Sequence, residues 1–236
     1  MNYTIHKADE RGNSHYDWLI SKHSFSFAEY YNPEKMGFGL LRVLNDDVVL
    51  GGYGFESHPH KNMEIISIPL SGALEHKDSI GNTSVIKTHD VQIMSAGTGV
   101  IHSEFNHSKT ETVNFLQLWI LPQQKNIAPH YQQLIFNPEK RKNILQNIVS
   151  PEKSDSTLWI NQDAYLYLSS LEKNSTIEYQ LHKKEHGVYI FVLEGNILVE
   201  KQTLKKRDAI GVWNTTHITI QAATPSEFLL IEVPMQ

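Results

Sequence analysis

The sequence has no cysteine among its 236 residues. This absence excludes disulfide bonds, cysteine-ligated zinc sites and thiol nucleophiles. Long hydrophobic runs are also missing, since no apolar stretch approaches the roughly 20 residues that span a bilayer. The first residues, Met1 to Gly12, are polar and charged and contain no apolar signal core. We therefore expect no membrane association and a cytoplasmic location.

A surplus of positive charge is absent as well. Lys and Arg number 21 against 26 Asp and Glu, which gives a net charge of −5. Affinity for a phosphate backbone depends on clustered basic residues. The one basic run, Lys205-Lys206-Arg207, is short and lies at an expected turn. Direct contact with nucleic acid is therefore not expected.

Helical periodicity is rare, and most of the chain consists of short β segments separated by Gly, Asn, Asp and Pro. Asn45-Asp46-Asp47 and Gly81-Asn82 supply turn residues between some of them. Many short strands at regular spacing indicate an all-β protein built from sandwiches or barrels. The predicted strands are 39–44, 48–52, 63–70, 83–87, 91–94 and 114–121 in the first half, and 158–160, 164–168, 176–181, 188–193, 197–200, 209–212, 218–220 and 228–233 in the second.

The segment 122–156 differs from the rest, because it is polar and rich in proline. It predicts one helix from Glu139 to Val149, with Pro138 at a favourable first position. On either side of it, an apolar strand followed by a small-residue turn occurs at 65–72 and again at 188–195. We therefore predict a duplicated barrel, with one domain at 1–138 and a second at 139–236 that includes the connecting segment.

Histidine is abundant: thirteen are present, and ten lie at or before His130. His58 and His60 are separated by one residue, and alternate side chains of a strand point to the same face. His102 and Glu104 repeat this spacing on a second segment, after a turn that Gly97 and Gly99 permit by positive φ. The two pairs predict three imidazoles and one carboxylate around a first-row metal.

Spacing alone leaves other interpretations open. A His-x-His pair on a strand can be a surface pair, and Glu64 competes with Glu104 as the acidic ligand. His76 with Asp78, and His89 with Asp90, fit turn residues. His23, His107 and His130 have no ligand spacing and fit either a surface position or one beside the site.

The order and density of motifs in the first half resemble the pirin family of the cupin superfamily. Gly52-x5-His58-x-His60-x3-Glu64 resembles the first cupin motif, and Gly97-x-Gly99-x-x-His102-x3-Asn106 the second. The blocks that resemble pirins are Ser24-Phe-Ser-Phe with Tyr30, Met36-Gly-Phe-Gly-Leu-Leu-Arg-Val, Asn45-Asp-Asp, His58-Pro-His60 with Met63-Glu-Ile, 74–82, 90–104 and Leu116-Gln-Leu-Trp-Ile.

The resemblance implies a bicupin of two jelly-roll barrels (double-stranded β-helices), with metal ligands His58, His60, His102 and Glu104. It thus favours Glu104 over Glu64. His89 departs from the family pattern, which has Gly before the Asp, and Lys61 and Asn62 also depart from it beside the site. The second half resembles the compact C-terminal barrel of bacterial pirin-like proteins, more loosely. There His182, His186 and His217 do not repeat the ligand pattern, which implies a degenerate cupin without metal.

The resemblance also implies a cofactor: one divalent transition metal, with Fe as first choice and Ni, Cu, Mn or Zn able to take the site. Ligating histidines must be neutral, so metal binding is expected to fail below about pH 6.

The function implied is that of a metal-dependent dioxygenase of the quercetin 2,3-dioxygenase type. Its partners are a small flavonol-like aromatic substrate and dioxygen, and the chain is expected to be a monomer. Glu104 is the expected catalytic base. Phe25, Phe27, Met36 and Phe38 are candidates to line the pocket, although residues of this kind more often belong to the core. Two alternatives remain: a redox-sensing interaction protein that resembles pirin transcriptional cofactors and has no turnover, and a metal-free binding cupin.

Overall fold

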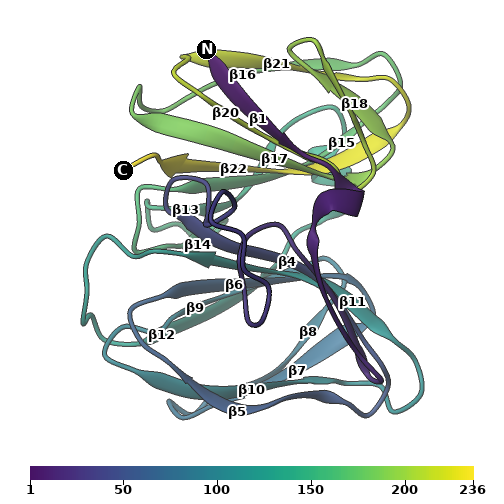
Figure 1. Ribbon diagram of the computed structural model, residues 1–236. Helices are drawn as coiled ribbons and strands as arrows, with labels where there is room; N and C mark the ends of the chain where they lie inside the picture. The colour runs from purple at the N-terminus through teal and green to yellow at the C-terminus, as the bar shows by residue number, and fades with distance from the viewer.

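The computed structural model describes residues 1–236 as four β-sheets in two units (Figure 1). Each unit pairs a seven-stranded sheet with a four-stranded sheet, and the two seven-stranded sheets face each other. All but one of the strand pairings are antiparallel. The predicted all-β bicupin fold is therefore confirmed.

The N-terminal unit has the strand orders β12-β9-β6-β11-β4-β3-β2 and β5-β10-β7-β8. Its strands are β2 (Gly12–Tyr16), β3 (Leu19–His23), β4 (Leu41–Val49), β5 (Gly54–His60), β6 (Glu64–Ser71), β7 (Ala73–Asp78), β8 (Thr83–Lys87), β9 (Asp90–Ser95), β10 (Val100–Asn106), β11 (Val113–Ile120) and β12 (His130–Ile135).

The C-terminal unit has the strand orders β1-β20-β17-β22-β15-β13-β14 and β16-β21-β18-β19. Its strands are β1 (Asn2–His6), β13 (Gln146–Ser150), β14 (Leu158–Trp159), β15 (Tyr165–Leu171), β16 (Thr176–Gln180), β17 (His186–Glu194), β18 (Asn196–Val199), β19 (Gln202–Lys205), β20 (Ala209–Trp213), β21 (His217–Ala222) and β22 (Ser226–Pro234).

The first strand of the chain belongs to the second unit. β1 pairs along its whole length with β20, so the N-terminus lies on the upper unit in Figure 1. The only helices are two short 3-10 turns, η1 (Ala8–Glu10) and η2 (Pro138–Arg141). None of the helical segments has the length or apolarity that crossing a membrane requires. The limit between the domains, at residues 138 and 139, stays a prediction. β1 precedes this limit in the sequence but belongs to a sheet of the C-terminal unit.

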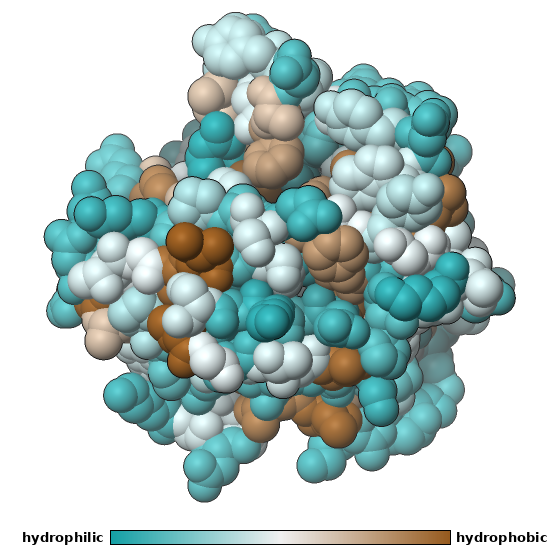
Figure 2. Space-filling view, turned by 90° about the horizontal axis from the view of Figure 1, so that it is seen from below, coloured by the Kyte–Doolittle hydropathy of each residue, from teal (hydrophilic) through white to brown (hydrophobic).

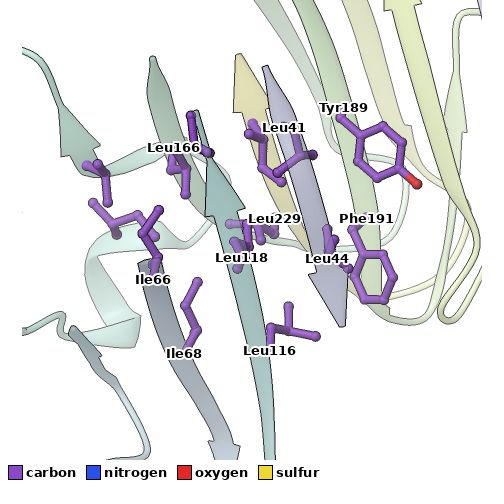
Figure 3. Packing of buried hydrophobic residues seen from close by; sticks show 14 of the residues in the cluster. Leu41, Leu44, Ile66, Ile68, Leu116, Leu118, Leu166, Tyr189, Phe191 and Leu229 are labelled. Carbon is purple, nitrogen blue, oxygen red and sulfur yellow. The ribbon is translucent and has the colours of Figure 1, made fainter. Parts of the chain in front are cut away.

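The largest apolar cluster, of 26 buried residues, lies between the two seven-stranded sheets. Figure 3 shows Ile66, Ile68, Leu116 and Leu118 of the N-terminal unit beside side chains of the C-terminal unit such as Leu229. A second cluster of 16 residues fills the C-terminal barrel. The N-terminal barrel has only two small clusters, of six and three residues, and polar side chains occupy the space between them. The candidate functional site lies among these polar side chains.

Two sequence predictions are wrong. Asn45-Asp46-Asp47 is not a turn but the middle of β4, where neighbouring strands bind its polar side chains. The helix predicted at 139–149 is the single turn η2, capped by Asn137, followed by β13. Pairing with β15 and burial of Ile148 and Val149 between the units override the local helical preference.

Candidate metal centre

The site is built around β10, the strand flanked by β5 and β7 in the four-stranded sheet. His102 pairs with His58 across one edge and with Asp78 across the other. His102 and Glu104 are buried, while the intervening Ser103 is less so, as the period of two requires. Gly97 and Gly99, which precede β10, have φ of +47° and +145°, which confirms the predicted positive-φ turn.

The three predicted histidine ligands converge. The ring centroids of His58, His60 and His102 lie 4.5 to 4.9 Å apart. His58 Nδ1 lies 2.7 Å from the backbone oxygen of Glu56, so that carbonyl accepts a hydrogen bond from Nδ1–H. This tautomer leaves the lone pair of His58 on Nε2, which lies 3.1 Å from His102 Nε2.

Glu104 lies on the same side of β10 as His102 and is 1% exposed. Its Oε1 accepts a hydrogen bond from Ser67 Oγ at 2.9 Å, and its Oε2 accepts one from Gln117 Nε2 at 2.6 Å. His102 belongs to two groups of three residues whose potential ligand atoms lie within 4.8 Å of one another. One group includes His58 and His60, and the other includes His76 and Glu104. The four-residue ligand set, with Glu104 as its acidic member, stays a prediction.

Burial controls the charge of these imidazoles. Desolvation, followed by the charges of neighbouring imidazoles, lowers the pKa of His102 to about 3 and that of His60 to about 4. Both rings are therefore neutral at pH 7 with a lone pair available to a metal.

The geometry of this cluster fits a transition-metal ion. Two nitrogens in adjacent coordination positions, each about 2.1 Å from an ion, stand about 3 Å apart. The 3.1 Å separation between the Nε2 atoms of His58 and His102 matches that spacing. Without a cation or a proton between them, two nitrogen lone pairs at this distance would repel each other. Histidine and carboxylate donors suit first-row metals such as Fe, Ni and Zn.

A cavity of about 340 Å³ adjoins the cluster. His58, His60 and Glu104 are among its lining residues, with five aromatic side chains, Tyr16, Trp18, Phe27, Phe55 and Trp119, and a polar wall of Ser14, Ser21, His23, Asn45, Asp47 and Gln117. Trp119 packs edge-on against His60 with ring centroids 4.9 Å apart. This volume falls in the usual range of small-molecule sites, about 300 to 1,000 Å³.

Of the four predicted pocket residues, only Phe27 lines the cavity. Phe25 and Phe38 belong to the apolar cluster between the units, and Met36 is 43% exposed. Phe25 and Phe38 therefore take the core position that was the alternative to a pocket role, and Met36 takes neither position. Sequence reasoning missed the polar wall, because Asn45 and Asp47 were interpreted as turn residues and Ser14 and Ser21 were given no role. His23 lies beside the site, which was one of the two positions expected for it.

Glu64, the rival acidic ligand, points away from the histidines. Its Oε2 accepts hydrogen bonds from Ser95 Oγ at 2.7 Å and from the backbone N of Asn161, which belongs to the other unit. On β6, Glu64 shares a face with Ile66 of the inter-unit cluster, whereas Ser67 faces Glu104. Strand parity therefore separates the two glutamates.

His76 was interpreted as a turn residue, which is wrong. It lies on β7, fully buried, with its ring centroid 5.3 Å from that of His102 and its Nε2 3.1 Å from Asp78 Oδ2. Its i,i+2 spacing to Asp78 was the available signal. Asp78 does bind a turn, by accepting from the backbone N of Ile80 and of Asn82. His89 is in the turn before β9 with φ of +76°, where the family pattern has Gly.

The remaining histidines considered as ligands lie away from the cluster. His107 is exposed beside Glu75, and His130 packs on Trp159. In the C-terminal unit, His182 and His186 both contact the buried carboxylate of Glu232, at 2.9 and 2.7 Å. His217 is exposed on β21.

Comparisons with known proteins agree with this architecture. Residues 5–120 match the family model Pirin, and residues 147–233 match the model described as Quercetinase C-terminal cupin domain. The chain is 42% identical to a protein of Escherichia coli (strain K12) named Quercetin 2,3-dioxygenase, over 98% of both chains. It is 36% identical to a Pirin-like protein of Caulobacter vibrioides, over 95% of this chain and 96% of that one.

Among solved structures, the chain resembles bacterial pirin YhhW from Escherichia coli in complex with nickel(II). The TM-score is 0.93 and the identity 41%, and the match covers 99% of each chain. With a family model over the N-terminal barrel, another over the C-terminal barrel, and relatives above 30% identity along nearly the whole length, this chain belongs to the pirin family.

Proposed function

We propose that this protein is a metal-dependent dioxygenase of the quercetin 2,3-dioxygenase type, acting on flavonol-like hydroxylated aromatic compounds. The observation that carries the proposal is the juxtaposition of three converging imidazoles with an aromatic-walled cavity of about 340 Å³. Its relatives bear the corresponding name at 42% identity.

In this proposal His58, His60, His102 and Glu104 hold one ion, with iron as the working metal. When bound, the metal supplies Lewis acidity and a route for electrons between the aromatic substrate and dioxygen. Burial keeps the imidazoles of His60 and His102 neutral, and Glu56 orients the His58 ring through its backbone oxygen. Ser67 and Gln117 fix both carboxylate oxygens of Glu104.

The cavity walls bind and orient the substrate. Trp119 and Phe27 meet edge to face at 5.4 Å, as do Trp18 and Phe55 at 5.5 Å, so two aromatic pairs can hold a planar ring system. Gln117 accepts a hydrogen bond from Trp119 Nε1 while donating to Glu104, and this chain links the wall to the metal ligands. The same walls exclude bulk water from the reacting groups.

The cavity favours an enzyme over the redox-sensing interaction protein. A sensor without turnover needs a surface that responds to the metal, whereas the imidazoles here open into a space sized for a small molecule. The face seen from below in Figure 2 carries apolar side chains scattered among polar ones, without one continuous apolar area for a partner. We propose further that the protein works as a cytoplasmic monomer.

Aerobic incubation of the iron-loaded protein with quercetin tests the proposal. Oxygen consumption and loss of the flavonol absorption are expected with the wild type and not with His58→Ala. A matched control, His107→Ala, removes an exposed imidazole of the same barrel and should retain the wild-type rate. Equal rates for wild type and His58→Ala, or no oxygen consumption with any flavonol, would refute the dioxygenase.

Elemental analysis of protein purified without added metal tests the choice of ion. Iron near one equivalent per chain is expected, with the highest turnover for the iron form. The Irving–Williams order favours nickel and copper over iron in affinity, so the most tightly bound ion need not be the most active. Higher turnover with nickel than with iron would correct the metal and keep the reaction.

A further inference from the structure

The cavity contains a second carboxylate, Asp47, that none of the roles above uses. Asp47 lies on β4, is 3% exposed and lines the cavity together with His58, His60 and Glu104. It forms no ion pair, whereas its neighbour Asp46 lies 3.6 Å from Arg11 and 3.3 Å from Arg207. A buried carboxylate without a cation costs stability, so its presence in the wall of a cavity points to a chemical role.

The hydrogen bonds of Asp47 leave one oxygen free. Oδ1 accepts from Ser21 Oγ, the residue opposite it on β3. Oδ2 has no hydrogen-bond partner in the protein, and this oxygen is not completely buried. It is therefore available to a group that enters the cavity.

A polar network holds Asp47 in position. Ser21 Oγ lies 3.3 Å from His23 Nδ1, which in turn lies 2.9 Å from Asn45 Oδ1, and His23 Nε2 lies 2.8 Å from Ser14 Oγ. Strand register places Ser14 opposite Ser21, Ser21 opposite Asp47 and His23 opposite Asn45. Burial lowers the pKa of His23, so its ring is neutral at pH 7 and serves as a hydrogen-bonding support.

Glu104 is less suited to receive a proton from the substrate. Both of its oxygens already accept hydrogen bonds, and as a metal ligand it would share its lone pairs with the ion as well. Either demand lowers the basicity of a carboxylate. Asp47 has neither constraint on its Oδ2.

We propose that Asp47 accepts the proton of the substrate's acidic hydroxyl as that oxygen enters the metal centre, with Ser21 and His23 as its positioning residues. This rests on the proposed function. The O–H bond of the substrate breaks, an O–H bond forms on Asp47 Oδ2, and the negative charge passes from the carboxylate to the substrate oxygen without any redox change. The substrate must then be an aromatic compound with an ionisable hydroxyl within reach of both the metal and Asp47.

The acid–base properties of Asp47 agree with this role. Burial, as the largest cause, and then the charges of Asp46 and Glu104, raise its pKa to about 7, against the Ser21 hydrogen bond that lowers it. General bases work best when their pKa lies near the working pH. The other titratable groups that line the cavity are Tyr16, His23, His58, His60 and Glu104.

The test is an anaerobic pH titration of quercetin bound to the iron-loaded protein. Ionisation of a hydroxyl on a conjugated ring moves its absorption to longer wavelength, so the midpoint of ionisation can be read without turnover. For Asp47→Asn, which keeps the shape and the Ser21 contact, we expect this midpoint to rise by at least one pH unit. In air, kcat/KM at pH 7 should fall about 100-fold and recover as rising pH ionises the substrate.

Two further variants make the result specific. Asp90→Asn removes another buried carboxylate of the same barrel that does not line this cavity, and it should keep the wild-type midpoint. Ser21→Ala leaves the Asp47 carboxylate in place without its hydrogen bond, and it should shift the midpoint by a smaller amount. If Asp47→Asn does not fold or hold metal, a wild-type midpoint in Ser21→Ala overturns the proposal.

The outcomes separate this proposal from the dioxygenase itself. Equal midpoints and equal rates for wild type and Asp47→Asn would overturn the role of Asp47 and leave Glu104 as the acceptor. A raised midpoint in Asp47→Asn, with no oxygen consumption by the wild type, would support Asp47 as the acceptor and refute the dioxygenase. Failure of the wild type to bind quercetin would overturn both.

Discussion

In the C-terminal barrel, 16 buried apolar residues form one continuous cluster, whereas the N-terminal barrel has two separate clusters of six and three. In the latter, Val100 and Leu74 lie beyond opposite ends of the His102–Glu104 stretch, since Leu74 pairs with Asn106. The space between holds imidazoles, carboxylates and amides. The two barrels have the same sheet arrangement but different interiors: that of the C-terminal barrel is an apolar core, and that of the N-terminal barrel contains the candidate site.

The comparison also explains why the two barrels stay together. A polar interior gives up apolar burial, which contributes about 25 cal/mol per Å². The 26-residue cluster between the two seven-stranded sheets supplies apolar burial on the outer face of the N-terminal barrel instead (Figure 3). Strand β1, which starts the chain but pairs with β20, adds a covalent and hydrogen-bonded link between the units.

The largest expected effect separates the histidines of the two barrels. His102→Ala should lower metal affinity by at least about 100-fold, since loss of an outer partner of a ligand alone costs 10- to 100-fold. His186→Ala, which removes a buried histidine of the C-terminal barrel, should keep one ion per chain. Metal analysis after gel filtration measures both. Full metal content in His102→Ala, or none in a folded His186→Ala, would break the contrast.

A matched pair of phenylalanine substitutions comes next. Phe228→Ala in the filled barrel should lower the free energy of unfolding by about 3–5 kcal/mol, because the fully buried ring leaves a cavity. Phe55→Ala, at the wall of the open cavity, should cost only about 1–2 kcal/mol and should raise KM instead. Denaturant unfolding and steady-state kinetics measure the two effects. Equal losses of stability would mean that the two interiors are packed alike.

The pH dependence of metal binding distinguishes buried imidazoles in the N-terminal barrel from solvent-exposed ones. Because burial lowers the pKa of His60 to about 4 and of His102 to about 3, protons compete with the metal only in strong acid. We expect the ion to be retained below pH 6, the limit expected from ordinary histidines, and to be lost as the pH approaches about 4. Metal content after dialysis across pH 7 to 3.5 tests this. Release centred at pH 6 would show that the rings behave as solvent-exposed imidazoles.

The metal-free protein should respond in the same window. Between pH 6.5 and 4 the unfolded chain binds protons on imidazoles that His60 and His102 leave unprotonated in the folded state, so stability falls as the pH falls. The loss should be smaller in His102→Asn. Asp47 and Glu64 oppose this loss of stability, because burial raises their pKa values to about 7. Their contribution to the free energy of unfolding is greatest below their unfolded pKa values and is lost as the pH rises through 7.

The smallest expected effect concerns one turn of the N-terminal barrel. His89 has φ of +76°, a conformation that favours Gly, and its side chain makes no hydrogen bond. His89→Gly should therefore stabilise the protein by about 0.5 kcal/mol, after the entropy that Gly adds to the unfolded chain is subtracted. A small rise in Tm with unchanged metal content is the expected result. A lower Tm would mean that the His89 side chain contributes packing to the cavity of about 230 Å³ that it lines together with Arg141 and Glu227.

Sequence patterns alone predict the β class, the approximate positions of most strands and the two i,i+2 pairs of the proposed ligand set. These follow from local rules: alternation of side chains along a strand, and the turn preferences of Gly at 97 and 99. The resemblance to pirins favours Glu104 over Glu64 as the acidic ligand, a choice that spacing alone leaves open.

Which polar residues face a cavity, and which face a turn or a neighbouring strand, depends on long-range pairing in the fold. Asn45 and Asp47 look like turn residues locally, but β3 and β11 pair with them and turn them into the wall of the site. The helix predicted at 139–149 became a strand, and β1 joined the far barrel, because pairing partners distant in sequence outweigh local propensity. Those long-range contacts are invisible to periodicity, which reports the face of a strand and not what that face meets.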